Sequence, residues 1–131
     1  MVTDPISDLI IRIKNASEAN KASVVLPYSK FAESIAQVLK NAGYLSSVER
    51  TGKKFVRDLE LGLVYFEGGV PRLHGVERIS STSRRIYQKA SDIRTYRSGF
   101  GNTVLSTPKG VLIDIDAKKL KVGGEVLFRI W

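Results

Sequence analysis

The first third of the chain alternates between helical and strand patterns of apolar residues. Apolar positions three and four residues apart predict a helix over residues 4–19, with Asp4 as an acidic cap candidate and Pro5 at the first helical position. A β-rich run over residues 23–27 predicts a strand, and Ser29 is a suitable N-cap for a second helix that Gly43 would end. The predicted order is therefore helix, strand, helix.

From Tyr44 onward apolar and polar residues alternate, which is the pattern of a half-buried strand. A turn at Thr51-Gly52-Lys53-Lys54 predicts a β-hairpin whose second strand runs from Phe55 to Phe66. Together with the earlier strand, this hairpin would make a small sheet that both helices can cover. The glycines and the proline of residues 67–71 then break the pattern.

Beyond this break the apolar runs are short and are separated by glycine, serine and lysine. They predict strands over residues 76–80, 84–87, 103–107, 111–114 and 125–131, with short helices from Ser91 and over residues 116–120. The predicted fold class is α+β. We expect an N-terminal α/β domain over residues 1–66, a connector over residues 67–71 and a mainly β C-terminal domain over residues 72–131.

Basic residues are concentrated in the middle of the chain. The formal net charge is +8, and residues 71–113 carry eight basic and two acidic side chains, which is six of the eight excess charges. This clustering indicates a polyanionic partner, with an anionic membrane surface or an ordinary soluble basic surface as the alternatives. Because the sequence has neither an export signal nor the roughly 20 apolar residues of a membrane span, we expect a cytoplasmic protein without a membrane partner.

Residues that carry catalysis or bind cofactors are scarce in this sequence. There is no cysteine for thiolate chemistry or disulfides, and the one histidine, His74, has no second ligand or carboxylate pair beside it. Asp114 and Asp116 could suggest magnesium, but an acidic pair at a strand end more often caps the next helix. We therefore expect no enzyme activity, metal, cofactor or small-molecule substrate.

Three short motifs suit contacts with nucleic acid. Ser106-Thr107-Pro108-Lys109-Gly110 combines hydroxyls, a rigid proline, a cation and a glycine, although an ordinary hairpin turn would use the same residue types. Arg84-Arg85-Ile86-Tyr87 places two guanidinium groups beside an aromatic ring, which suits phosphate contacts and base stacking but also an exposed strand. Gly123-Gly124-Glu125 offers close backbone approach and an acceptor, or a glycine turn before the last strand.

These motifs belong to a longer series that occurs in the order of one known family. The series is Thr3-Asp4-Pro5-Ile6-Ser7-Asp8, Arg12-Ile13-Lys14-Asn15-Ala16, Pro27-Tyr28-Ser29-Lys30, Gly43-Tyr44, and residues 75–80, 84–87, 106–111 and 123–127. The chain thus resembles, over nearly its whole length, the bacterial small-subunit ribosomal proteins of the S-eight family.

The resemblance implies a structural protein that binds the central domain of small-subunit ribosomal RNA and helps to assemble the subunit platform. It implies ribosomal proteins five and twelve of that subunit as neighbours. A second, compatible hypothesis is repression of its own operon messenger RNA; a third, an RNA-modifying or RNA-cleaving enzyme, finds no supporting cluster in the sequence.

The family's RNA-contacting loop falls, by position, on residues 106–110. The full set of residues that we expect at the RNA is Ser106, Thr107, Pro108, Lys109, Gly110, Arg84, Arg85, Tyr87, Gly124 and Glu125, with lesser contacts from Arg12 and Lys14.

This loop departs from the family pattern at one position. The family usually has Ser-Thr-Ser where this chain has Ser106-Thr107-Pro108, so one hydroxyl and one backbone donor are missing. A literal Ser-Thr-Ser occurs at residues 81–83, where the family tends to have a Lys-Pro-Gly turn. We interpret that triplet as separate from the RNA-contacting loop.

Overall fold

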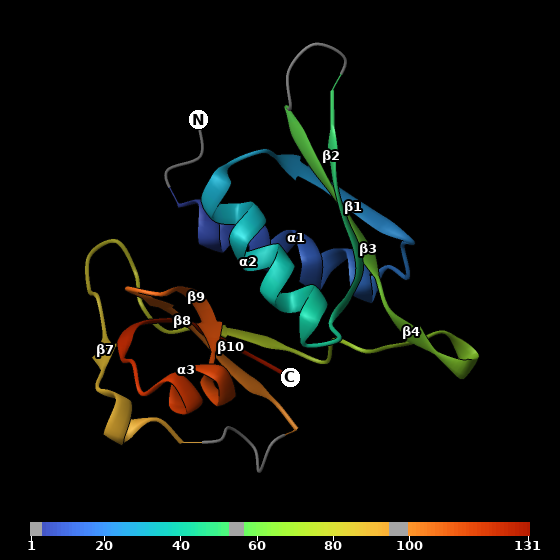
Figure 1. Cartoon of the computed structure of the whole chain (residues 1–131). Helices are drawn as coiled ribbons and strands as arrows, with labels where there is room; N and C mark the ends of the chain where they lie inside the picture. Colours follow the sequence, from blue (N-terminus) through green and yellow to red (C-terminus); the bar gives the residue numbers. More distant parts are fainter. Residues whose placement is uncertain (1–3, 53–56, 95–99) are drawn as a thin grey trace. The chain divides into compact units, whose positions relative to one another are not determined.

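The computed structural model describes residues 4–52, 57–94 and 100–131 of the chain. The chain divides into two compact units, the first ending at His74 and the second covering Gly75–Trp131. The α+β class is confirmed, because two helices accompany antiparallel strands in the first unit and strands predominate in the second (Figure 1).

The N-terminal unit has the predicted order of helices and strands. Its main elements are α1 (Pro5–Glu18), β1 (Ser23–Pro27), α2 (Lys30–Asn41), β2 (Leu45–Thr51) and β3 (Asp58–Leu63). The three strands form an antiparallel sheet in the order β1-β3-β2, and both helices lie on one side of it (Figure 1). Lys53 and Lys54 of the predicted turn lie outside the described residues.

Both helices start at the capping residues that the sequence predicts. The Asp4 carboxylate accepts a hydrogen bond from Ser7 N at 3.2 Å, and Ser29 Oγ accepts one from Ala32 N at 3.1 Å. Each cap satisfies a backbone donor that the first helical turn leaves without a partner. Gly43 follows α2 with φ +92°, a conformation that glycine adopts without strain.

The apolar faces of α1 and α2 are buried with the sheet residues of the same unit. The side chains with at most 2% of their surface exposed include Leu9, Ile13, Ile35, Leu39, Leu59 and Leu61. Complete burial of one such side chain stabilises a fold by about 1.5–3 kcal/mol. This core holds the unit together.

The predicted strand from Phe55 to Phe66 is wrong at its C-terminal end. β3 stops at Leu63, and β4 (Tyr65–Phe66) pairs with β5 (Val70–Pro71) across a 3-10 turn, η1 (Glu67–Gly69). Two glycines of this turn have φ of +81° and +76°. The turn therefore reverses the chain although the apolar alternation continues into β4.

The C-terminal unit is built around a sheet of five strands. Its elements are β6 (Val76–Arg78), β7 (Tyr87–Gln88), η2 (Ala90–Asp92), β8 (Asn102–Thr107), β9 (Gly110–Ile113), α3 (Asp114–Leu120) and β10 (Gly124–Ile130). The strand order is β6-β10-β8-β9, and β7 also pairs with β10. A core cluster joins α3 and η2 to the sheet; its buried members are Ile93, Leu105, Ala117 and Val126.

β6 and β7 share one edge of β10, because β8 pairs along the other edge. Val126 O accepts from Ser80 N at 3.2 Å, and Val126 N donates to Ile86 O at 2.8 Å. The chain therefore leaves the edge after Ser80 and returns at Ile86, with residues 81–85 as a loop. The predicted strand over residues 84–87 is wrong in its first three positions, because β7 begins at Tyr87; Arg84 and Arg85 belong to that loop.

The predicted capping role of Asp114 and Asp116 is also wrong. Both residues lie inside the first turn of α3, and Ile113 is the N-cap residue, without a side-chain cap. Negative charge in a first turn still favours the helix through the helix dipole.

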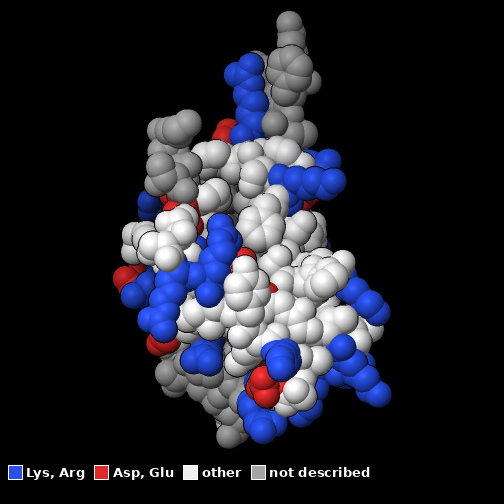
Figure 2. Space-filling view, turned by 90° about the vertical axis from the view of Figure 1, so that its left-hand side faces the viewer, with Lys and Arg blue, Asp and Glu red and all other residues white. Residues whose placement is uncertain are grey.

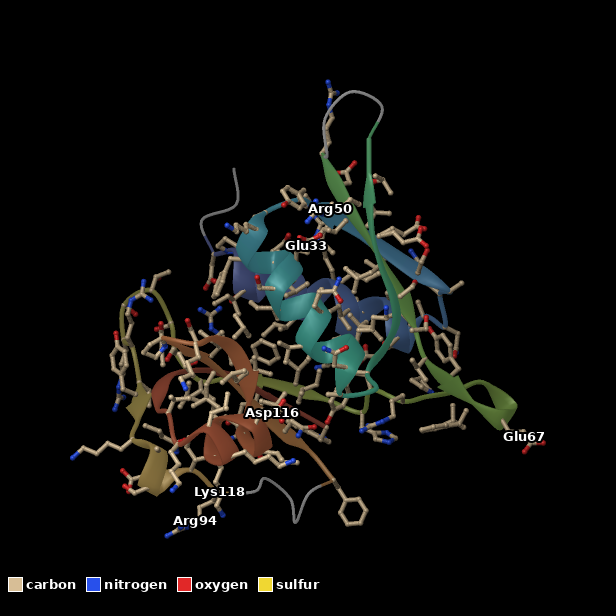
Figure 3. All side chains as sticks on the ribbon, in the orientation of Figure 1. Glu33, Arg50, Glu67, Arg94, Asp116 and Lys118 are labelled. Atoms are coloured by element: carbon tan, nitrogen blue, oxygen red, sulfur yellow. The ribbon has the colours of Figure 1, made fainter. Side chains whose placement is uncertain are left out.

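One ion pair links α2 to β2 in the N-terminal unit. Arg50 Nε and Nη2 donate to the two carboxylate oxygens of Glu33 at 2.5 and 2.7 Å (Figure 3). The guanidinium also lies 5.7 Å from the centre of the Tyr28 ring. The hydrogen bond to Arg50 lowers the pKa of Glu33, and the same bond raises the pKa of Arg50.

This pair predicts a pH dependence of stability. The folded pKa of Glu33 lies below its unfolded value, so the stabilisation is present above the usual glutamate range and is lost as the pH falls through the lowered folded pKa. We expect Arg50→Gln to raise the Glu33 pKa in an NMR titration and to weaken the acid dependence of unfolding. The control Arg57→Gln, at an exposed position of the same unit, should leave both unchanged; equal Glu33 titrations in wild type and Arg50→Gln would refute the assignment.

Candidate nucleic-acid interface

Residues 106–110 form the turn of the β8–β9 hairpin. Thr107 pairs with Gly110, so Pro108 and Lys109 occupy the two turn positions, and both are exposed. Thr107 Oγ1 donates to Gly110 O at 2.8 Å and accepts from Lys109 N at 3.1 Å. Gly110 has φ +105°, and a Cβ there would meet no atom within 4 Å. The hydroxyl of Thr107 therefore holds the turn in its conformation.

The two hydroxyls of this segment are not equivalent. Thr107 has already used its proton and one lone pair within the turn, so its oxygen can still accept but cannot donate. Ser106 Oγ has no hydrogen-bond partner in the part of the chain that the structure describes, and the residue is half-buried. Of the two side chains, Ser106 is thus the one with a donor left for a ligand.

Strand β10 brings three of the predicted site residues into one row. Glu125 pairs with Ser106 of β8 on one side and with Tyr87 of β7 on the other. Directly opposed residues of antiparallel strands point to the same face of a sheet, so the three side chains are neighbours. Tyr87 has 66% of its surface exposed, which leaves its ring open to a partner. β7 and the β8–β9 hairpin thus lie along opposite edges of β10.

A second contact ties the loop of residues 81–85 to this row. Arg85 Nη1 lies 3.2 Å from each carboxylate oxygen of Glu125. The Glu125 side chain is 15% exposed and that of Arg85 57% exposed, so the carboxylate lies at the base of the pair and the guanidinium nearer to solvent. The pair therefore orients Arg85 while leaving part of its charge accessible.

Ser80 closes the base of the same loop, a role that sequence reasoning missed. Its fully buried hydroxyl accepts from Ile86 N at 2.9 Å and donates to Ile86 O at 3.2 Å. Nothing local in the sequence distinguishes this serine from its neighbours, because its partner depends on the long-range pairing of β10.

The Ser-Thr-Ser triplet at residues 81–83 forms the turn of that loop. Ser81 Oγ accepts from Arg84 N at 3.1 Å and lies 3.2 Å from Ser83 Oγ. Two of the three hydroxyls therefore help to fold the loop, which carries the exposed side chain of Arg84.

Gly124 has a structural reason to be glycine. A Cβ at this position would overlap with Ser106 O and come within 3.0 Å of Thr107 Cα. The close backbone approach that the sequence suggested for RNA is occupied here by the protein's own strand β8. An RNA contact of Gly124 stays a prediction.

Arg12 and Lys14 belong to the N-terminal unit, on α1. Arg12 Nε lies 2.9 and 3.0 Å from the two oxygens of Asp8, and its Nη1 donates to Val25 O at 3.0 Å. Lys14 is exposed, and residues two apart on a helix do not share a face. The two cations therefore do not form one patch.

Positive charge dominates the face shown in Figure 2. Lys and Arg side chains are distributed over this face, and Asp and Glu are few. In the interface, the exposed cations are Arg84, Arg85 and Lys109, and Glu125 is paired. The local charge is therefore suited to phosphate.

Two absences concern the described residues, 4–52, 57–94 and 100–131. No group of three or more acidic or histidine side chains there could hold a metal ion. No helix there has both the length and the apolarity to cross a membrane.

Comparison with known proteins decides the family. The family model described as Ribosomal protein S8 matches residues 4–131. The chain belongs to the ribosomal protein S8 family. Membership in the S8 family places it among the structural proteins of the small ribosomal subunit and not in a family of enzymes.

Bacterial relatives named small ribosomal subunit protein uS8 match along their whole length. The protein of Nitrobacter hamburgensis is 43% identical over 131 residues, covering 98% of this chain and 97% of the relative. That of Paramagnetospirillum magneticum is 40% identical over 131 residues, covering 99% and 98%. That of Persephonella marina is 40% identical over 136 residues, covering both chains fully. The resemblance to the S8 family is thereby confirmed.

The tight contact at Gly124 yields a test of this part of the fold. Gly124→Ala should lower the free energy of unfolding by about 1–3 kcal/mol, because the added methyl group forces β8 and β10 apart. At Gly110 an added methyl group would meet no other atom, so Gly110→Ala should lower the free energy of unfolding only through the strain of a positive φ, by about 1 kcal/mol. Urea unfolding of both variants compares them; a Gly124→Ala protein as stable as wild type would contradict the pairing described here.

Proposed function

We propose that this S8-family protein binds the central domain of small-subunit ribosomal RNA directly and helps to assemble the subunit platform. Residues 72–131 are the principal RNA-binding part, following a connector over residues 67–71. The observation that carries this proposal is the row of Ser106, Glu125 and Tyr87 between two exposed cationic turns. The proposed role needs no cofactor and no catalytic chemistry.

The mixture of groups in this row suits an irregular RNA helix. A regular RNA duplex presents its bases in a deep, narrow groove that side chains cannot read, so a protein reads bases where the helix is distorted. Tyr87 offers an exposed ring on which an unpaired base can stack. Ser106 can donate and Thr107 can accept, which fits 2′-hydroxyl and base-edge groups.

The cations around the row position the RNA backbone. Arg84 and Lys109 lie on two different turns, and a phosphate contact from each fixes the helix at two points. Arg85 serves phosphate with the donors that Glu125 does not occupy. Glu125, held in place by Arg85, can accept from an exocyclic amine of a base.

The N-terminal unit adds lesser contacts in this proposal. Lys14 is exposed and can reach phosphate, whereas Arg12 has several donors occupied by Asp8 and Val25. The excess of basic over acidic residues in residues 71–113 also favours the C-terminal unit as the main site.

Other partners follow from the family resemblance. Small-subunit ribosomal proteins five and twelve are proposed as neighbours, on a bacterial-type ribosome in the cytoplasm. Repression of the protein's own operon messenger RNA would use the same surface, because an RNA that imitates the ribosomal site presents the same groups.

The phosphate contacts predict a specific salt dependence. Arg84→Ala should weaken binding to ribosomal RNA fragments of any sequence and reduce the slope of log affinity against log salt by about one unit. Arg57→Ala, an exposed arginine of the N-terminal unit, is the control and should keep the slope. An unchanged slope for Arg84→Ala would refute the phosphate contact.

The hydroxyls predict a separation of affinity from stability. Ser106→Ala should lower affinity for the cognate RNA by about 1 kcal/mol, the worth of one hydrogen bond, with unchanged stability. Thr107→Ala should lower affinity by a similar amount and should also destabilise the hairpin, because it removes both turn bonds.

Binding isotherms at one salt concentration, with urea unfolding of the same variants, make the comparison. Pro108→Ser should keep or modestly improve the affinity for the cognate RNA. Ser83→Ala should lower that affinity less than Ser106→Ala does. If Ser83→Ala loses specificity while Ser106→Ala and Thr107→Ala do not, the RNA-contacting loop is assigned to the wrong turn.

A further inference from the structure

A cavity of about 300 Å³ lies in the C-terminal unit, between α3 and the segment that follows η2. It is lined by Ile93, Arg94, Asp114, Ile115, Lys118 and Lys119. No residue of the proposed RNA interface lines it. The cavity is therefore separate from the row on β10.

Asp114 lines this cavity, and one of its two carboxylate oxygens has no donor among the described residues. The residue is 2% exposed, and its Oδ1 accepts from Asn102 Nδ2 at 3.1 Å. Its Oδ2 is buried and has no hydrogen-bond partner among the residues that the structure describes. A buried carboxylate oxygen without a donor is costly, so a group that donates to it would be stabilising.

The remaining lining combines apolar walls with positive charge. Ile93 and Ile115 can enclose a flat apolar ring, and Ile115 is 38% exposed, so the cavity reaches the surface. Arg94, Lys118 and Lys119 are exposed cations from two different segments. Figure 3 shows Arg94 and Lys118 close together on one side of α3.

We propose that this cavity binds one unstacked nucleotide of RNA. The base would lie between Ile93 and Ile115 and donate an exocyclic amine hydrogen to Asp114, and the phosphate would contact the three cations. Cytosine has such an amine on its Watson–Crick edge, whereas the one donor on that edge of uracil lies between two carbonyl oxygens that a carboxylate repels. The cavity thus favours cytidine over uridine.

The inference deepens the proposed function, because it assumes that RNA is the partner, but it can be tested without ribosomal RNA. The experiment follows the methyl NMR signals of Ile93 and Ile115 in the full chain during titrations with CMP, UMP and ribose 5-phosphate. We expect CMP to shift both signals and to bind about tenfold more tightly than UMP, the factor that a hydrogen bond to a carboxylate is worth. Ribose 5-phosphate should leave both signals unchanged.

Two variants sharpen this test. Asp114→Asn keeps an acceptor for Asn102 and adds a donor, so it should bring the affinities for CMP and UMP close to equality. The double variant Lys118→Gln, Lys119→Gln, at exposed positions, should weaken both nucleotides alike and keep their ratio.

Two results would overturn the inference. One is that neither nucleotide shifts the Ile93 and Ile115 signals. The other is that CMP, UMP and ribose 5-phosphate act equally, which would leave a nonspecific anion patch. Because Ser106 and Arg84 lie outside the cavity, their variants still test the proposed function if the nucleotides fail to bind.

Discussion

Strand β10 is hydrogen-bonded along both of its edges, and the C-terminal unit depends on this double pairing. β8 occupies one edge, and β6 and β7 occupy the other, with the loop of residues 81–85 between them. Because Gly124 allows β8 to approach so closely, Glu125 aligns with Ser106 on one side and Tyr87 on the other. Three segments that are distant in sequence thereby become one surface.

The groups on this surface are held before any partner arrives. Thr107 closes its own turn, Ser80 closes the base of the neighbouring loop, and Glu125 orients Arg85. A surface that is ordered in advance loses little conformational entropy on binding, so more of the interaction energy appears as affinity. The proline at position 108 acts in the same direction, since it fixes one backbone dihedral angle of the turn.

Local signals predicted the elements whose causes are local. The caps at Asp4 and Ser29 and the apolar periodicity of α1 and α2 depend on neighbours in sequence, and these helices form as expected. The sequence predictions were wrong where long-range strand pairing or turn geometry determines the end of an element. Nothing within residues 84–87 shows that Arg84 and Arg85 leave the sheet edge, because their place depends on the bonds of Val126 to Ser80 and Ile86.

The same limit applies to the candidate site. The sequence indicated the three motifs by residue type, but the pairing of Arg85 with Glu125, forty positions apart, comes from the register of the sheet. The Thr107 hydroxyl is occupied within the protein because of the turn conformation. One oxygen of Asp114 lacks a partner among the described residues because of how α3 packs against β8. Residue types predicted a polyanionic partner, and tertiary structure determines which atoms remain free to contact it.

In the proposed function, the β8–β9 turn lies against one irregular helix of small-subunit ribosomal RNA. The chain has no cysteine, so Lys109→Cys creates a single attachment point for an iron chelate that cleaves nearby RNA with hydroxyl radicals. With the labelled protein bound to small-subunit ribosomal RNA, we predict cleavage confined to one irregular helix of the central domain. Bound protein that gives no cleavage from position 109, or weak cleavage scattered over the RNA, would contradict the claim.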